Sequence, residues 1–192
     1  MGVTFDNEKQ MFVFDFEHDG SEDIVKLTGD GYQVEAFGKC FYYGYEFSEQ
    51  VDGNVRSAFI KYVKFTNELQ DNPDLTGFIK NAIDNLSKKI NLYDYNLVVM
   101  PESSSRVNQY MLRYIYRFAQ PKLCKVVDVL APKKDEQLCA SIRQQNVLVI
   151  DDVTTSGSTL NEILRTLRIL NEDNEITIFS LIGRKDLMAE AV

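Results

Sequence analysis

One stretch of the chain reads Val147-Leu148-Val149-Ile150-Asp151-Asp152-Val153-Thr154-Thr155-Ser156-Gly157-Ser158-Thr159-Leu160. Its first four residues are apolar, which predicts a buried strand of a parallel sheet over residues 147–150. Two carboxylates follow at once, and then a hydroxyl-rich turn around one glycine. The next apolar residues keep the spacing of one helix face: Leu160, Ile163, Leu164, Leu167 and Leu170. The stretch therefore predicts a strand, a loop and a helix, with its polar groups at the carboxyl end of the strand.

These polar groups have the chemistry of a sugar-phosphate site. Ligands of open α/β sheets bind outside the carboxyl ends of the strands, and a helix N-terminus attracts phosphate. Gly157 would let the backbone approach a phosphate closely. Asp151 and Asp152 would repel it, so they fit better as acceptors for sugar hydroxyls or as neighbours of a bound Mg²⁺. A helix cap is the simpler interpretation, but one such residue suffices for a cap, and seven of the nine residues 151–159 are acidic or carry a hydroxyl.

Residues 151–159 resemble the phosphoribosyl-pyrophosphate (PRPP) motif of type I phosphoribosyltransferases. The resemblance implies a glycosyltransferase that moves the phosphoribosyl group of PRPP to a nitrogenous base or related acceptor and releases pyrophosphate. Asp151 and Asp152 would be the acids of the catalytic site, holding the ribose hydroxyls. The loop that binds the 5′-phosphate would consist of Thr154, Thr155, Ser156, Gly157, Ser158 and Thr159. Mg²⁺ would enter together with PRPP, and no protein side chain is assigned to it as a metal ligand.

A second polar loop follows an apolar strand predicted over residues 97–100. In the family, the loop after the first core strand cradles pyrophosphate. By resemblance, this role falls to Ser103, Ser104, Ser105 and Arg106, with the arginine supplying a charge-assisted contact. A serine-capped helix is the alternative interpretation. Glu102 would repel pyrophosphate unless it points away or reaches a metal ion.

Residues 131–146 show little apolar periodicity. In the family, a mobile loop at this place closes over the reacting centre and excludes water. Lys133, Lys134 and Arg143 would then meet the leaving pyrophosphate. A solvated charged loop is the alternative interpretation.

The order of elements predicts an α/β fold like that of type I phosphoribosyltransferases. Strands are predicted at residues 97–100, 123–129, 147–150 and 176–182, with a helix, a loop and a helix between them in turn. These βα units predict a parallel, Rossmann-like sheet flanked by helices. We expect one compact domain with a β-rich N-terminal hood over residues 1–50 and a phosphoribosyltransferase core over residues 51–192.

The predicted hood contains four apolar segments separated by turn residues, at positions 11–16, 24–27, 32–37 and 40–47. The last segment holds an aromatic cluster with two interpretations, sheet packing or a face on which a nucleobase stacks. Its members are Phe41, Tyr42, Tyr43, Tyr45 and Phe47. Helices are predicted over residues 51–65, with Asp52 or Asn54 as the cap, and from Asn72-Pro73 onward.

Composition limits the classes of function. The 192 residues are 44% hydrophobic and 26% charged, as in a globular domain. A formal net charge of −8 argues against nucleic-acid binding, which depends on Lys and Arg. No apolar run approaches the ~18 residues of a membrane span, and no signal-peptide pattern is present. Three widely separated cysteines (Cys40, Cys124 and Cys139) then indicate reduced thiols in a cytoplasmic protein.

Within the family, residues 55–65 and 106–109 resemble the competence-protein F branch, although the zinc-binding cysteines of that branch are missing. The partners predicted are the small molecules PRPP and an unidentified base, with no membrane, and a homodimer through the core helices is one hypothesis. The competing hypothesis is a non-catalytic PRPP- or nucleotide-binding regulatory or assembly protein with the same fold. An enzyme would release pyrophosphate from PRPP, whereas a sensor would bind PRPP and leave it intact.

Overall fold

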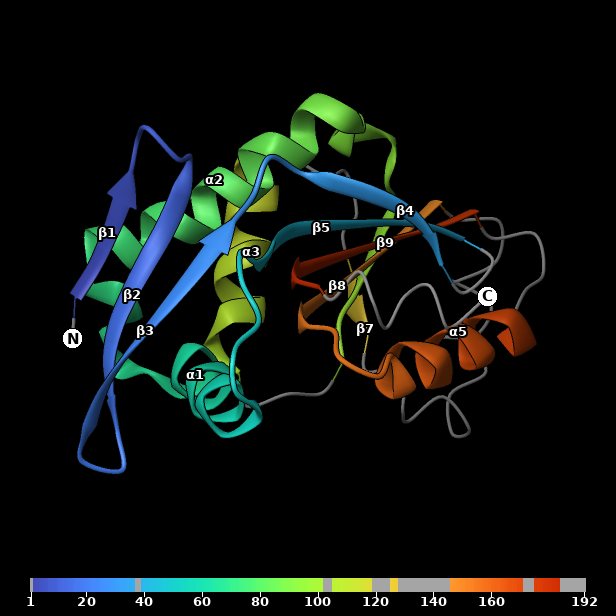
Figure 1. Ribbon diagram of the computed structural model, residues 1–192. Coiled ribbons are helices and arrows are strands. Elements are labelled where there is room, and N and C mark those ends of the chain that lie inside the picture. The colour runs from blue at the N-terminus through green and yellow to red at the C-terminus, as the bar shows by residue number, and fades with distance from the viewer. Residues whose placement is uncertain are drawn as a thin grey trace.

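The computed structural model describes residues 2–36, 39–101, 105–118, 125–127, 146–170 and 175–183. They form one sheet with helices packed on it (Figure 1). The strands are β1 (Gly2–Asp6), β2 (Met11–His18), β3 (Ser21–Thr28), β4 (Tyr32–Ala36), β5 (Lys39–Phe47), β6 (Leu97–Val99), β7 (Lys125–Val127), β8 (Asn146–Val153) and β9 (Glu175–Ile182). The helices are α1 (Gly53–Phe65), α2 (Pro73–Lys89), α3 (Arg106–Phe118) and α5 (Ser158–Leu170), with short 3₁₀ turns η1 (Asn67–Gln70) and η2 (Leu92–Asp94). The predicted α/β class is confirmed.

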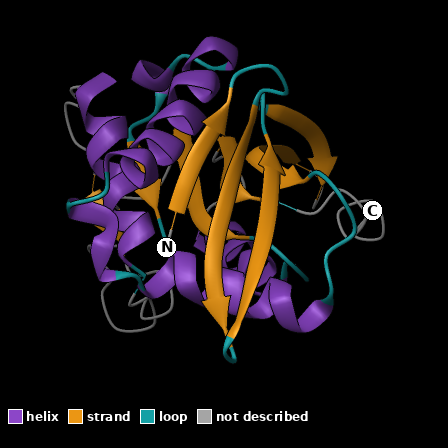
Figure 2. Ribbon diagram, turned by 60° about the vertical axis from the view of Figure 1, so that its left-hand side comes forward, coloured by secondary structure: helices purple, strands orange, loops and turns teal. Residues whose placement is uncertain are grey.

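The strands follow the order β1-β2-β3-β5-β9-β8-β6-β7, and β4 pairs with β5 on the side. Strands β5, β9, β8, β6 and β7 are mutually parallel, whereas β1, β2 and β3 form an antiparallel meander. Figure 2 shows the meander strands side by side, with helices packed beside them. Only two residue pairs, Leu27 with Phe47 and Thr28 with Glu46, join β3 to β5. A single sheet thus contains both the strands of the predicted hood (residues 1–50) and the strands of the predicted core, because β5 pairs with β9.

Strand β8, in the parallel part of the sheet, is buried on both faces. In β8, Leu148 and Ile150 belong to the hydrophobic cluster that includes side chains of α1, α2 and α3. Val147 and Val149 belong to the cluster on the opposite face, which includes side chains of α5. A strand covered on both faces has no polar side, which explains the continuous apolar run in its sequence.

Local sequence signals fix the starts of the first two helices. The Asp52 carboxylate accepts a hydrogen bond from the Asn54 N–H and caps α1. The Asn72 side chain accepts from two N–H groups of α2, and Pro73 occupies the first helical position. Helix α1 thus begins two residues after the predicted start at residue 51, with Asp52 rather than Asn54 as its cap, whereas the predicted start of α2 is confirmed. Strand β1 was not predicted, because a five-residue segment with a single buried side chain, Val3, shows too little periodicity.

Aromatic rings join the meander to α2. The ring of Phe78 lies 5.2 Å from those of Phe12 and Phe14 and is stacked on Tyr45, with centroids 4.1 Å apart. The buried Tyr45 hydroxyl donates to the Phe78 carbonyl at 2.7 Å. All aromatic side chains of β5 with described burial are at least partly covered, and Tyr43 and Tyr45 are only 1% exposed. Sheet packing is therefore the correct interpretation of this cluster.

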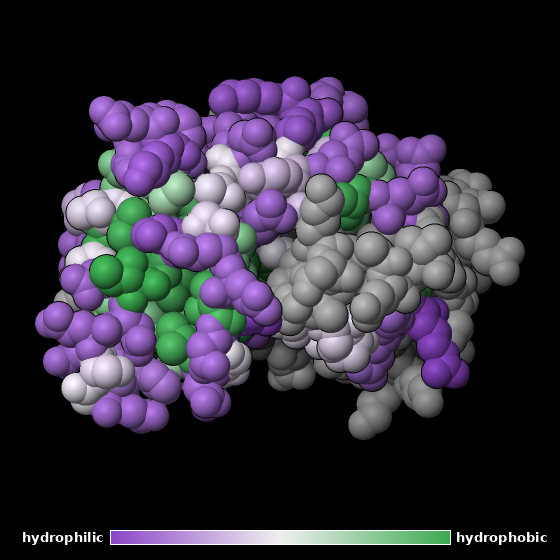
Figure 3. All heavy atoms as spheres, viewed as in Figure 1, coloured by the Kyte–Doolittle hydropathy of each residue, from purple (hydrophilic) through white to green (hydrophobic). Residues whose placement is uncertain are grey.

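The opposite face of the meander is more open. Figure 3 shows hydrophobic residues gathered over these strands, and Ile24 of β3 is 62% exposed. Antiparallel sheets commonly keep one solvated face of this kind. Among the described residues, none of the helices has the length and apolar character required to cross a membrane.

Candidate functional site

The acids of the predicted site lie at the carboxyl end of β8. Asp151 and Asp152 are 7% and 1% exposed, although carboxylates are rarely buried without a partner. The loop of residues 154–157 follows, and α5 begins at Ser158. The predicted succession of strand, loop and helix is confirmed.

Gly157 makes the turn into α5 with a φ of +71°, a backbone conformation that L side chains rarely adopt. Its carbonyl accepts a hydrogen bond from the Asn161 N–H at 2.8 Å, so this residue already belongs to the first turn of the helix. The positive φ is the reason why this position requires glycine.

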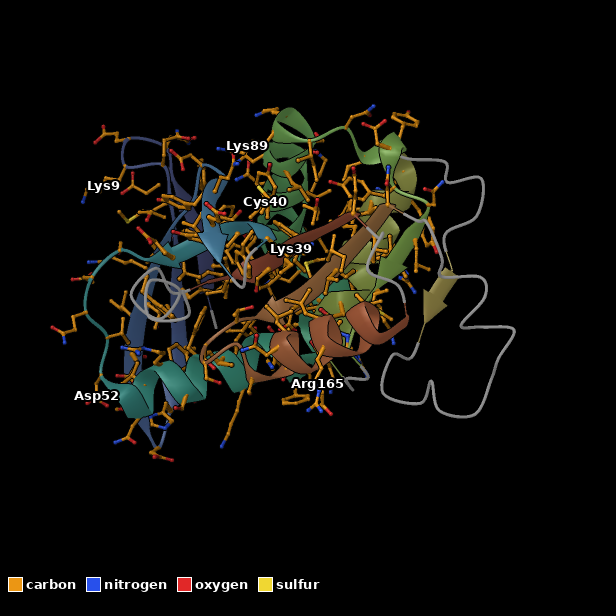
Figure 4. The ribbon with its side chains drawn as sticks, turned by 90° about the vertical axis from the view of Figure 1, so that its right-hand side faces the viewer. Lys9, Lys39, Cys40, Asp52, Lys89 and Arg165 are labelled. Atoms are coloured by element: carbon orange, nitrogen blue, oxygen red, sulfur yellow. The ribbon has the colours of Figure 1, made fainter. Side chains whose placement is uncertain are left out.

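The loop hydroxyls divide into one anchor and a group at the surface. Thr154 is buried, and its hydroxyl donates to Ser180 Oγ of β9 at 2.9 Å. Its N–H also donates to the Ile182 carbonyl, so Thr154 ties the loop to the neighbouring strand. The exposed hydroxyls belong to Thr155, Ser156, Ser158 and Thr159. These four residues surround the N-terminus of α5, where unpaired N–H groups attract anions. Figure 4 shows this helix, with Arg165 labelled further along it.

The two acids are neighbours at the end of β8, and their side chains lie close enough to interact. Asp152 faces the helical layer of α1, where its Oδ1 lies 2.9 Å from Lys64 Nζ. The same oxygen accepts the Val153 N–H at 2.6 Å, whereas Asp152 Oδ2 is buried without a hydrogen-bond partner in the described part of the chain. Asp151 Oδ1 accepts the Asp152 N–H at 2.9 Å. Each acid thus has one oxygen bound to backbone.

Burial and mutual repulsion shift the protonation of the pair. Loss of solvation, the largest cause, and the negative charge of Asp152 together raise the pKa of Asp151 from 3.8 to about 7. The positive charge of Lys64 and the hydrogen bond from the Asp152 N–H act in the opposite direction. Near neutral pH, both the protonated and the ionised form of Asp151 are therefore populated, and perturbed pKa values of this kind are common in functional sites.

The two other predicted loops are described only in part. Ser105 is buried, and Arg106 opens α3 with its side chain exposed. Ser103 and Ser104 of the predicted pyrophosphate loop lie outside the described residues, as do Lys133, Lys134 and Arg143 of the predicted mobile loop. Their roles stay predictions. The structure brings together the acids at the end of β8 and the hydroxyls at the start of α5.

Sequence reasoning missed two polar side chains in the helical layer that Asp152 faces. Lys64 pairs with Asp152, although 88 residues separate them in the chain. Asn108, in the first turn of α3, is 2% exposed, and neither its amide nitrogen nor its amide oxygen has a hydrogen-bond partner in the described segments. Its neighbour Val107 belongs to the same hydrophobic cluster as Ile150 and Val153 of β8. No local sequence pattern around Lys64 or Asn108 predicts that either residue belongs to a site.

We expect Asn108→Leu to raise the free energy of unfolding by about 1 kcal/mol, because an unpaired buried amide is replaced by an apolar group of similar shape. The matched control is Asn81→Leu, since Asn81 Nδ2 donates to Tyr45 Oη at 3.2 Å. That variant should lose about 1 kcal/mol instead. Urea denaturation of both variants checks the pair, and a loss of stability in Asn108→Leu would show that its amide is satisfied in solution.

No protein-family model matches the chain, and no curated protein sequence matches it significantly. Solved structures similar to it include a hypoxanthine-guanine-xanthine phosphoribosyltransferase, with 15% identity, a TM-score of 0.42 and coverage of 57% of this chain and 62% of that one. The match therefore spans less than two thirds of that structure. A Corynebacterium diphtheriae phosphoribosyltransferase shows 14% identity, a TM-score of 0.39 and coverage of 68% and 94%. The Mycobacterium tuberculosis orotate phosphoribosyltransferase in complex with PRPP shows 15% identity and a TM-score of 0.36, and the match covers 68% of this chain and 88% of that one.

Proposed function

We propose that this chain binds PRPP with Mg²⁺ and transfers its phosphoribosyl group to a nitrogenous base or related acceptor, releasing pyrophosphate. The observation that carries the proposal is the buried acid pair of β8 directly followed by the Gly157 turn and the exposed hydroxyls of α5. A phosphorylated sugar matches both halves of this arrangement. The phosphate would meet the helix N-terminus, and the sugar hydroxyls would donate to the carboxylates.

The ribose would be held in a fixed orientation by its two ends. Thr154 anchors the loop to β9, so the phosphate-binding N–H groups are preorganised relative to the acids of β8. The acids would hold the ribose hydroxyls while a nitrogen nucleophile displaces pyrophosphate from the anomeric carbon. Fixed orientation of the reacting groups lowers the barrier, because their freedom is lost on binding rather than during the reaction.

Magnesium belongs to this proposal as a companion of the ligand. The described residues hold no group of three or more His, Cys, Asp or Glu side chains that would form a metal site. Lys64 already pairs with Asp152, so the donor set fits a Mg²⁺ bound by the oxygens of PRPP and by water. When bound, the ion would neutralise charge on the leaving pyrophosphate.

Thermal unfolding with PRPP and Mg²⁺ tests the proposal. A ligand at about 100 times its Kd stabilises the folded state by about 2.7 kcal/mol, which for a chain of this size raises Tm by about 5–10 °C. We expect this rise in the wild type and its loss in Asp151→Asn/Asp152→Asn. The control Asp15→Asn/Glu17→Gln removes two exposed acids and should keep the full rise. No rise in the wild type would refute PRPP binding.

Pyrophosphate release then separates the two classes of function. The wild type, incubated with PRPP, Mg²⁺ and a panel of purine, pyrimidine and other nitrogen acceptors, should release pyrophosphate with at least one of them. A wild type that shows the thermal shift but leaves PRPP intact with every acceptor would instead favour a non-catalytic binding protein.

A further inference from the structure

Lys64 provides the cation that compensates the buried acid pair. It lies in the last turn of α1, and its ammonium group is 2.9 Å from Asp152 Oδ1. The Asp152 side chain is 1% exposed, whereas the Lys64 side chain is 28% exposed and reaches the acid from the rim of the site. Lys61, one turn earlier on α1, is exposed and has no ion pair among the described residues.

The two carboxylate oxygens of Asp152 differ in their hydrogen bonds. Oδ1 accepts from both Lys64 Nζ and the Val153 N–H, so its position is fixed from two sides. Oδ2 is buried and receives no hydrogen bond from any described residue. A buried acceptor without a donor is unfavourable, so a sugar hydroxyl that reached Oδ2 would supply the hydrogen bond that this oxygen lacks.

The same lysine sets the charge of the pair. Two adjacent buried carboxylates repel each other, and removing the only cation of a buried ion pair leaves an uncompensated charge. Within the described part of the chain, the charged side chains that shift the pKa of Asp151 are Asp152 from its own strand and Lys64 from α1. Lys64 therefore contacts one acid directly and lowers the pKa of the other.

We propose that Lys64 is a positioning residue of the sugar site: it holds Asp152 so that Oδ2 accepts a hydrogen bond from a sugar hydroxyl, and it makes α1 part of the site. This inference rests on the proposed function. It assigns Lys64 to the sugar half of the ligand alone, because the phosphate half lies at the start of α5, where Lys64 makes no described contact.

Separate titrations with ribose 5-phosphate and with inorganic phosphate, followed by thermal shift, test the assignment. Lys64→Met should raise the Kd for ribose 5-phosphate about tenfold or more and leave the Kd for inorganic phosphate unchanged. Lys64→Arg should restore most of the affinity, because a guanidinium keeps the charge and two donors toward the carboxylate. Lys61→Met, the matched control on the same helix, should bind both probes as the wild type does.

A second readout separates positioning from a merely structural role. Because Lys64 lowers the pKa of Asp151, Lys64→Met should move the titration of the Asp151 carboxyl carbon, followed by ¹³C NMR, to higher pH. If Lys64→Met fails to fold, Lys64→Ala replaces it, since alanine is well tolerated in a helix and removes both the donor and the charge. Unchanged affinity for ribose 5-phosphate in these variants would overturn the inference, whereas a wild type that binds neither PRPP nor ribose 5-phosphate would overturn the proposed function as well.

Discussion

Asp151→Asn is expected to raise the free energy of unfolding by about 4 kcal/mol at pH 8, with the gain shrinking as the pH falls from about 7 to about 4. A pKa raised from 3.8 to about 7 corresponds to a difference of about 4 kcal/mol between the protonated and ionised forms. In that pH window the folded wild type binds more protons than the unfolded chain, so its stability falls as the pH rises. Asparagine has no proton to lose, and its amide oxygen can still accept the Asp152 N–H.

Urea denaturation of the wild type and Asp151→Asn between pH 4 and pH 8 measures this difference. Asp71→Asn is the matched control, since Asp71 is exposed and should show no pH-dependent difference of this size. An equal effect of Asp151→Asn at pH 4 and pH 8 would mean that Asp151 ionises with an ordinary pKa. A carboxylate with a pKa raised in this way would lower the stability of the folded chain at neutral pH, which is typical of residues retained for function rather than for stability.

Phe78→Ala is expected to lower the free energy of unfolding by about 3–5 kcal/mol, the usual effect of removing a buried aromatic ring. Phe78 is 1% exposed and contacts the rings of Phe12 and Phe14 from β2 and of Tyr45 from β5. The change should weaken the N-terminal strands and α2 together, because the same ring packs on both.

Urea denaturation followed by circular dichroism and by tyrosine fluorescence checks this effect. The two probes should give coincident transitions, since one sheet spans the predicted hood and core. Tyr93→Ala is the control, because Tyr93 is 70% exposed and its loss should change stability by less than about 0.5 kcal/mol. Two separate transitions would instead show that the residues before position 50 unfold as a unit of their own.

Local signals allowed most strands and helices to be predicted, together with the strand, loop and helix that carry the acids and hydroxyls of the candidate site. The apolar run of β8, the acids after it and the helical spacing of α5 are contiguous, so their succession could be read directly. The helix starts at Asp52 and Asn72 were also predictable, because a cap acts on N–H groups two or three residues away. In each of these cases, the residues that cause the structure are neighbours in the chain.

Contacts between distant segments could not be predicted in the same way. The pairing of Lys64 with Asp152 depends on how α1 packs over the end of β8, and nothing around Lys64 distinguishes it from the exposed Lys61. The position of β5 is a similar case. Its aromatic pattern predicts a strand, but its parallel pairing with β9 depends on the sheet order.

The place of β5 also has a consequence for how the protein is made. Cys40 of β5 lies beside Thr177 of β9. On its parallel side, β5 can therefore form its hydrogen bonds only after the ribosome has produced β9, which comes much later in the chain. At about 5–20 residues per second, β5 waits on the order of ten seconds with only its antiparallel neighbours, β3 and β4, to pair with. The central sheet therefore closes after synthesis has passed β9, and in the interval the open edge of β5 is a place where a nascent chain can meet a chaperone or another copy of itself.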